Sequence, residues 1–109
     1  MLLVATDPAF AHHDTGPGHP ERVARLTAAV AGVDAAGLGD AVVPLAPREA
    51  TVDELALVHP VAYLEALERF CVAGGGDIDA DTRASAGSWR AGRLAAGAGL
   101  GAVEALRRG

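Results

Sequence analysis

Two short apolar runs on either side of an amphipathic stretch are the feature that most constrains the fold of this chain. Residues 2–5 (LLVA) and 41–45 (AVVPL) are uncharged and too short for helices, which is typical of buried strands in a parallel sheet. Between them, residues 20–36 place apolar side chains at helical spacing on one face, namely Val23, Leu26, Val30 and Val33. A strand, a helix and a second strand form a βαβ unit, so the sequence predicts an α/β fold with a parallel sheet.

The remainder of the chain predicts helices and no further strand. Thr51–Glu54 (TVDE) has the pattern of a capping box, which starts a short helix. Pro60 is expected to start the next helix, which carries Tyr63, Leu64, Leu67 and Cys71 along one side. The glycines at 74–76 are interpreted as a flexible stop after that helix. A last helix is predicted over about 86–108, capped by Ser85 or Ser88, and its interior glycines permit close packing against a neighbour.

Two strands and about four helices make an unfinished architecture. Parallel sheets normally contain several strands and are covered on both faces, so a two-stranded parallel sheet is an improbable complete domain. We therefore expect residues 1–109 to be the incomplete N-terminal segment of a single larger domain.

The stretch His13–Arg22 (HDTGPGHPER) concentrates the chemically specific side chains of the chain. Gly16–Gly18 (GPG) is a strong turn signal, and Pro20 suits the first position of a helix, with Glu21 in the favourable first turn. In an open α/β sheet, ligands bind beyond the carboxyl ends of the strands, where this loop lies. A turn followed by a helix cap explains the same residues without any ligand, and the loop alone leaves both interpretations open.

Two groups of residues could be taken for metal sites. The adjacent pair His12–His13 is a weak candidate, because neighbouring residues on an extended loop point to different sides. Asp77, Asp79 and Asp81 alternate in DIDAD and could bind a hard cation, but the central Gly and later Glu of a calcium loop are missing. We expect no metal ligand set in this chain.

Charge and composition exclude several classes of partner. The net charge of −5 and the scattered arginines argue against a nucleic-acid surface. The longest uncharged apolar run, residues 94–103, is shorter than the ~20 residues that span a membrane. Cys71 is the only cysteine, so we expect no disulfide and a reduced, cytoplasmic setting.

Three motifs, in order, resemble the zinc-dependent histone deacetylase family in its class II-like, acetoin-utilisation and acetylpolyamine amidohydrolase branches. They are HDTGPGHPERVARL (13–26), LALVHPVAYLEAL (55–67) and DIDADTRASAGSWRAGRLAAGAGLGAVEAL (77–106). The resemblance implies the N-terminal part of an arginase-like, three-layer α/β fold with a parallel sheet. It also implies hydrolysis of an acetyl-lysine-type or acetylpolyamine-like amide by a domain that holds zinc. The family's zinc ligands and catalytic His pair have no match here, so this chain alone is expected to bind no zinc and to be inactive.

The resemblance assigns roles to four residues of this chain. His19 and Pro20 match the entrance loop, and Asp81 matches an acid that grips substrate amides at the rim of the site. Arg22 matches an Arg that lines an internal cavity. Ala86 and Arg83 replace a Pro and a Tyr that are common in the family near this rim. The residues themselves allow a plainer interpretation, with Arg22 on a helix surface and Asp81 as a cap.

Two other functions fit the sequence. The chain could be a non-catalytic, truncated binding or assembly module, or a small metal-binding protein that uses His and Asp side chains. Sequence alone does not separate a protein substrate from a polyamine or other small-molecule substrate.

Overall fold

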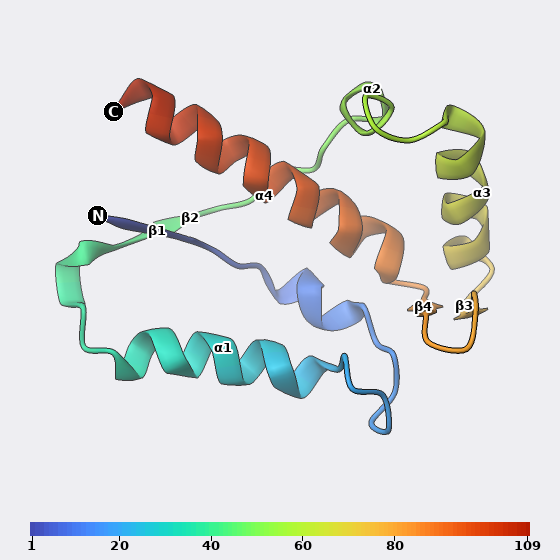
Figure 1. The fold of residues 1–109 in the computed structure, drawn as a ribbon, viewed down its shortest axis with the longest axis horizontal. Coiled ribbons are helices and arrows are strands. Elements are labelled where there is room, and N and C mark those ends of the chain that lie inside the picture. The colour runs from blue at the N-terminus through green and yellow to red at the C-terminus, as the bar shows by residue number, and fades with distance from the viewer.

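The structure of the chain is a computed structural model that describes all residues from 1 to 109. Figure 1 shows a mixed α/β arrangement in which two strands run between two long helices. The elements in chain order are β1 (Leu2–Ala5), the 3-10 helix η1 (Pro8–His12), α1 (Val23–Ala35), the 3-10 helix η2 (Gly39–Ala41), β2 (Val42–Leu45), α2 (Val52–Leu55), α3 (Val61–Val72), β3 (Gly75–Asp77), β4 (Arg83–Ser85) and α4 (Ser88–Arg108).

The predicted βαβ unit is confirmed. β1 pairs with β2 in parallel, with Leu2 opposite Val42 and Ala5 opposite Leu45. α1 connects the two strands, and its half-buried positions are the four that the spacing predicted: Val23, Leu26, Val30 and Val33. α4 lies on the other side of the strands from α1 and contacts both β1 and β2.

α1 begins later than the sequence predicted. Its first residue is Val23, not Pro20, and Arg22 before it has an extended backbone with φ −146° and ψ 163°. The reason lies in the loop, because the Thr15 hydroxyl donates to the Glu21 carbonyl and the Glu21 N–H donates to the His19 ring. These bonds hold Glu21 outside the helix, so the expectation that it occupies the first helical turn is wrong.

A hairpin stands where the sequence predicted only a flexible stop. α3 ends at Val72 as expected, but Gly75 and Gly76 then continue into β3, which pairs antiparallel with β4. Gly75 has φ +76°, and a Cβ there would run into the backbone of Ala84. Glycine is therefore required at this position by both backbone conformation and contact, and that requirement gives the triplet a structural meaning beyond flexibility.

The start of α4 also differs from expectation. The helix begins at Ser88, its N-cap is Gly87, and no side chain caps it. The Ser88 hydroxyl instead accepts from the Ser85 N–H at 2.7 Å and so fixes the preceding turn. The predicted role of Ser85 or Ser88 as the helix cap is therefore wrong.

The close packing expected of α4 is present against residues 48–50. Ala50 is completely buried, and its N–H donates to the Arg93 carbonyl at 2.9 Å. The Arg93 side chain returns a hydrogen bond to the Ala50 carbonyl at 3.0 Å. A Cβ at Gly97 would collide with the Arg48 carbonyl, so the helix can approach this closely only with glycine there.

The capping box at the start of α2 is confirmed in both directions. Thr51 accepts from the Glu54 N–H at 3.1 Å, and the Glu54 carboxylate accepts from the Thr51 N–H at 2.9 Å. Pro60 then precedes α3, whose inner side buries Leu64 and Cys71.

The core is small for a chain of this length. Only 9 of 109 residues are buried, and most are small. No helix of the structure combines the length and apolar character that a bilayer crossing requires.

Candidate functional site

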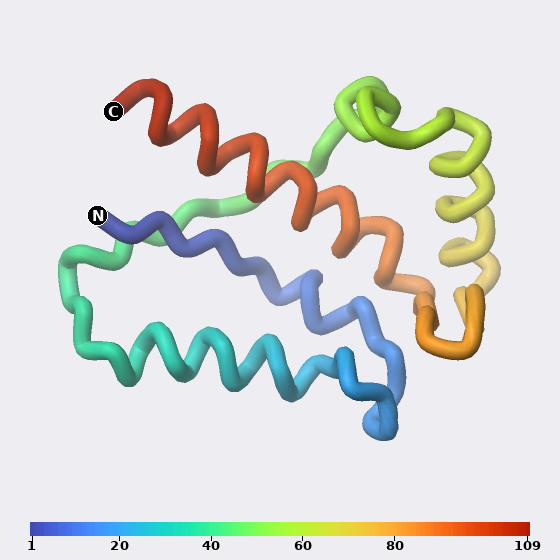
Figure 2. The backbone as a smooth tube through the Cα atoms, viewed as in Figure 1, coloured from blue at the N-terminus to red at the C-terminus, as the bar shows by residue number.

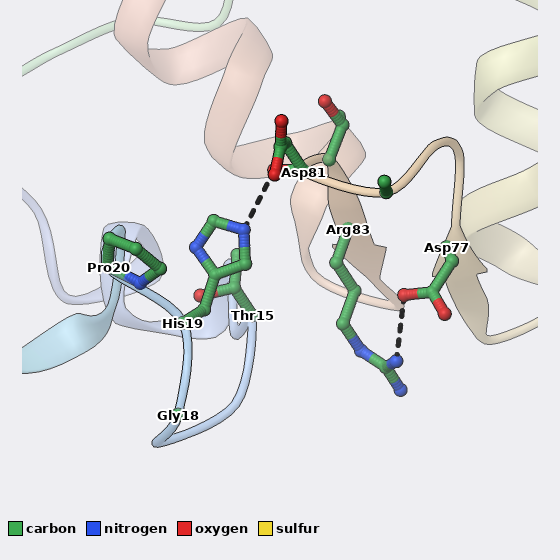
Figure 3. A pocket seen from close by; sticks show the side chains of 9 residues that line it. Thr15, Gly18, His19, Pro20, Asp77, Asp81 and Arg83 are labelled. Carbon is green, nitrogen blue, oxygen red and sulfur yellow. Dashed lines mark hydrogen bonds and ion pairs between the residues drawn. The ribbon is translucent and has the colours of Figure 1, made fainter.

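A groove of about 540 Å³ opens between the His13–Arg22 loop and the turn of the β3–β4 hairpin. Figure 2 shows that these two segments, far apart in the sequence, lie at the same end of the molecule. Three sequence-predicted site residues, His19, Pro20 and Asp81, line this groove together. Figure 3 shows them in close-up, with Thr15, Asp77 and Arg83 also in view.

The first wall of the groove is a loop held by its own hydrogen bonds. Gly16 has φ +89°, as its turn requires, and its N–H donates to the Asp14 carboxylate at 2.8 Å. Thr15 is buried, with 7% of its surface exposed, and its hydroxyl donates to the Glu21 carbonyl. The loop therefore presents the His19 ring from a fixed base.

The second wall is the turn of the hairpin. Arg83 pairs with Asp77 at 3.0 Å across the two strands. Within the turn, the Asp79 carboxylate accepts from the Asp81 N–H at 2.8 Å. This bond, with help from Thr82, holds the pKa of Asp79 below its ordinary value. Asp79 is thus held as a charged acceptor. Asp81 makes its own hydrogen bonds through its backbone N–H and carbonyl, not through its carboxylate.

One hydrogen bond joins the two walls directly. The Nε2 atom of His19 lies 2.8 Å from the carbonyl oxygen of Asp81, 62 positions later in the chain. Sequence reasoning placed both residues at the rim of a site, but nothing in the local pattern of either segment indicated this contact.

A second junction joins the same loop to the turn before α4. The Ser85 hydroxyl donates to the His12 carbonyl at 2.8 Å and accepts from the Asp14 N–H at 2.9 Å. Beside it, His13 Nδ1 lies 2.7 Å from the Ser88 hydroxyl. The sequence did not predict that Ser85 and Ser88 bind the 12–14 backbone and side chains. The only local indication was that the two serines lie on either side of Gly87.

Gly87 makes that junction possible. A Cβ at Gly87 would lie 2.5 Å from both the Cβ and the carbonyl oxygen of His12, which is far inside normal contact distance. The backbone of the loop can therefore lie directly on the turn only because residue 87 is glycine.

Arg22 lies outside the groove. Its side chain is exposed, and its Nη1 donates to the Pro17 carbonyl at 3.0 Å. It borders a separate hollow of about 380 Å³ with Phe10, His13 and Leu26. Its expected place in an internal cavity stays a prediction.

The residues of this chain do not fit a metal ion. No three His, Cys, Asp or Glu side chains come together in a way that could hold one. In the DIDAD stretch, Asp77 is paired with Arg83 and Asp79 accepts from the backbone. Cys71 is buried, and burial raises the pKa of its thiol, which keeps it protonated and a poor metal ligand. The site can therefore accept or donate hydrogen bonds to a ligand, but these residues supply no metal centre.

The parallel βαβ unit with helices on both sides and a groove at one end defines an α/β domain, and similarity to known proteins identifies its family. A profile of the histone deacetylase domain matches residues 19–109. The chain belongs to the histone deacetylase family.

The sequence similarity to known relatives extends over almost the whole chain. A protein of Methanothermobacter thermautotrophicus named "Probable deacetylase" is 34% identical over 109 residues, which are 99% of this chain and 32% of the relative. A "Histone deacetylase-like amidohydrolase" of Pseudomonas aeruginosa is 31% identical over 102 residues, 94% of this chain and 25% of that protein. The crystal structure of the HDA15 HD domain matches with a TM-score of 0.78 and 32% identity, over 88% of this chain and 28% of that one. The chain thus spans about a third or less of the proteins it matches.

Proposed function

We propose that this chain is the N-terminal segment of one zinc-dependent, deacetylase-type amide hydrolase domain. The domain would remove the acetyl group from acetyl-lysine or acetylpolyamine-like substrates, and this segment would build one side of the substrate entrance. The observation that carries the proposal is the groove in which His19, Pro20 and Asp81 come together, in a chain that belongs to the deacetylase family.

The residues would act by binding and orientation. The free Asp81 carboxylate can accept two N–H bonds from a substrate, the role that suits an acid at a rim. His19 and Pro20 would shape the entrance beside it, and Arg22 would line a cavity deeper in the whole domain. Zinc would be held by residues outside these 109, so we assign no step through a metal to this chain and expect it alone to be inactive.

The expected partners are small or extended substrates with an acetylated amine. We propose no nucleic-acid or membrane partner, in keeping with the net charge of −5. The proposed compartment is the cytoplasm, supported by a single cysteine that is free.

The first test is the intact mass of the native protein in its source cells, by mass spectrometry. The proposal predicts a species much heavier than 10.9 kDa that contains these peptides. A native species of 10.9 kDa would contradict the proposal that the chain is part of an enzyme. It would favour the alternative, a non-catalytic binding or assembly module.

The second test is deacetylase activity of that native protein on an acetyl-lysine peptide and on an acetylpolyamine. In Asp81→Ala, kcat/KM should fall about tenfold or more, because a hydrogen bond to a charged group is lost. Glu65→Ala on α3 removes an exposed carboxylate outside the groove and serves as the matched control. Equal activity of the two variants would contradict the role of Asp81.

A further inference from the structure

We propose that His19 and Asp79 are positioning residues. His19 holds the carbonyl of Asp81 and Asp79 holds its N–H, and together they set the place of the Asp81 carboxylate. The inference rests on the proposed function, because it concerns the group expected to bind substrate. It goes beyond that function by assigning a task to two residues that need not touch substrate themselves.

The main chain of Asp81 is held at both of its polar groups. Its N–H donates to Asp79 Oδ1 at 2.8 Å, and its carbonyl accepts from His19 Nε2 at 2.8 Å. The turn is closed further by Thr82, whose carbonyl accepts from Ile78 at 2.8 Å. Both backbone polar groups of Asp81 are thus paired, and its side chain is free of intramolecular hydrogen bonds beside the groove.

The hydrogen bonds of His19 indicate which tautomer its ring adopts. The Glu21 backbone N–H can only donate, so His19 Nδ1, 3.0 Å away, must be the unprotonated acceptor. The Asp81 carbonyl can only accept, so Nε2 must carry the proton. The geometry therefore assigns the proton to Nε2, because a proton on Nδ1 would be directed at the Glu21 N–H.

The support behind His19 is itself anchored. Glu21, whose N–H orients the His19 ring, is held at two points. Its carbonyl accepts a hydrogen bond from the hydroxyl of the buried Thr15, and its carboxylate pairs with Arg25. On the opposite wall, Asp77 pairs with Arg83. The charged neighbours of the groove are thus already partnered, and Asp81 is left as the free carboxylate.

The kinetic test is a double-mutant cycle in the native protein. His19→Ala should raise KM about two- to tenfold with little change in kcat, since a positioning hydrogen bond is lost. His19→Gln should restore part of the loss, because its terminal amide places a donor near the position of Nε2. In an Asp81→Ala background, His19→Ala should have no further effect. Additive losses in the two backgrounds would overturn the positioning role.

The second test needs no activity. Nitrogen-15 NMR of the His19 ring should show the Nε2–H tautomer near neutral pH. Amide exchange of Asp81 should accelerate in Asp79→Ala and stay slow in Asp79→Asn, whose side-chain oxygen still accepts. An Nδ1–H tautomer, or unchanged exchange in Asp79→Ala, would overturn the inference. A native protein with these signatures but no deacetylase activity would refute the proposed function and leave the positioning of Asp81 standing.

Discussion

Gly97 and Gly99 lie two positions apart on α4, but one is packed against backbone and the other faces open space. Gly97 is buried against the Arg48 carbonyl, whereas nothing lies within 4 Å of the position a Cβ would take at Gly99. The composition of the helix indicates close packing in general. It does not indicate which glycine makes the contact, because that depends on residues 48–50 crossing the helix.

Alanine substitution should separate the two glycines. Gly97→Ala should lower the free energy of unfolding by about 1–3 kcal/mol or more, because a methyl group is forced against backbone. Gly99→Ala should raise it by about 0.5–1 kcal/mol, the ordinary gain for an open helical site. Urea denaturation of the native protein measures both, and equal effects of the two variants would contradict the close approach of α4.

At the scale of elements, α2 is tied to α4 through one arginine. Arg48 donates two hydrogen bonds of 2.8 Å to the Glu54 carboxylate and a third of 3.1 Å to Glu104. The Arg48 side chain and the Thr51 N–H lower the pKa of Glu54 from its ordinary 4.5 to about 2. The hydrogen bonds to Glu54 and then to Glu104 raise the pKa of Arg48 above its usual range.

The cluster of Arg48, Glu54 and Glu104 predicts that the free energy of unfolding falls in acid. Because the pKa of Glu54 is lowered by folding, its stabilising effect is complete above about pH 4.5 and is lost as the pH falls toward 2. Glu54→Gln should be less stable at pH 7 and should show less change between pH 4.5 and 2. Asp53→Asn, which removes a charge from the same turn but no ion pair, should keep the fall in acid. Denaturation across this pH range is the measurement, and an unchanged slope in Glu54→Gln would count against the cluster.

Elements whose causes are local could be predicted from the sequence. The strand at Leu2–Ala5 and the capping box at Thr51 follow from neighbouring residues, and both are present. The β3–β4 hairpin could not be predicted, because its two strands are three residues each and two of those residues are glycines of poor strand propensity. The groove was half predictable: its residues were identified by motif, but the bond from His19 to Asp81 joins segments that local patterns do not connect.

The whole molecule is thin and open for its length. It measures 42 × 34 × 18 Å, and its radius of gyration is 15.4 Å, against about 13 Å for a compact domain of this size. Leu57, Val58 and Val72 are each about four-fifths exposed, and Val103 and Leu106 are more than half exposed. Such a surface is more apolar than an isolated compact domain tolerates well.

The exposed apolar surface predicts how the 109 residues behave as an isolated chain. They should bind the dye ANS strongly and associate as their concentration rises, because exposed apolar side chains favour both. Dye fluorescence and light scattering over a concentration series measure this. A cooperative unfolding transition without dye binding would instead support the non-catalytic module.

The bond between His19 and Asp81 also has a consequence for synthesis on the ribosome. The two walls of the groove are made 62 residues apart. At about 5–20 residues per second, Asp81 is added roughly 3 to 12 s after His19. During that interval the His13–Arg22 loop lacks its partner, and the groove can form only after the hairpin has left the exit tunnel.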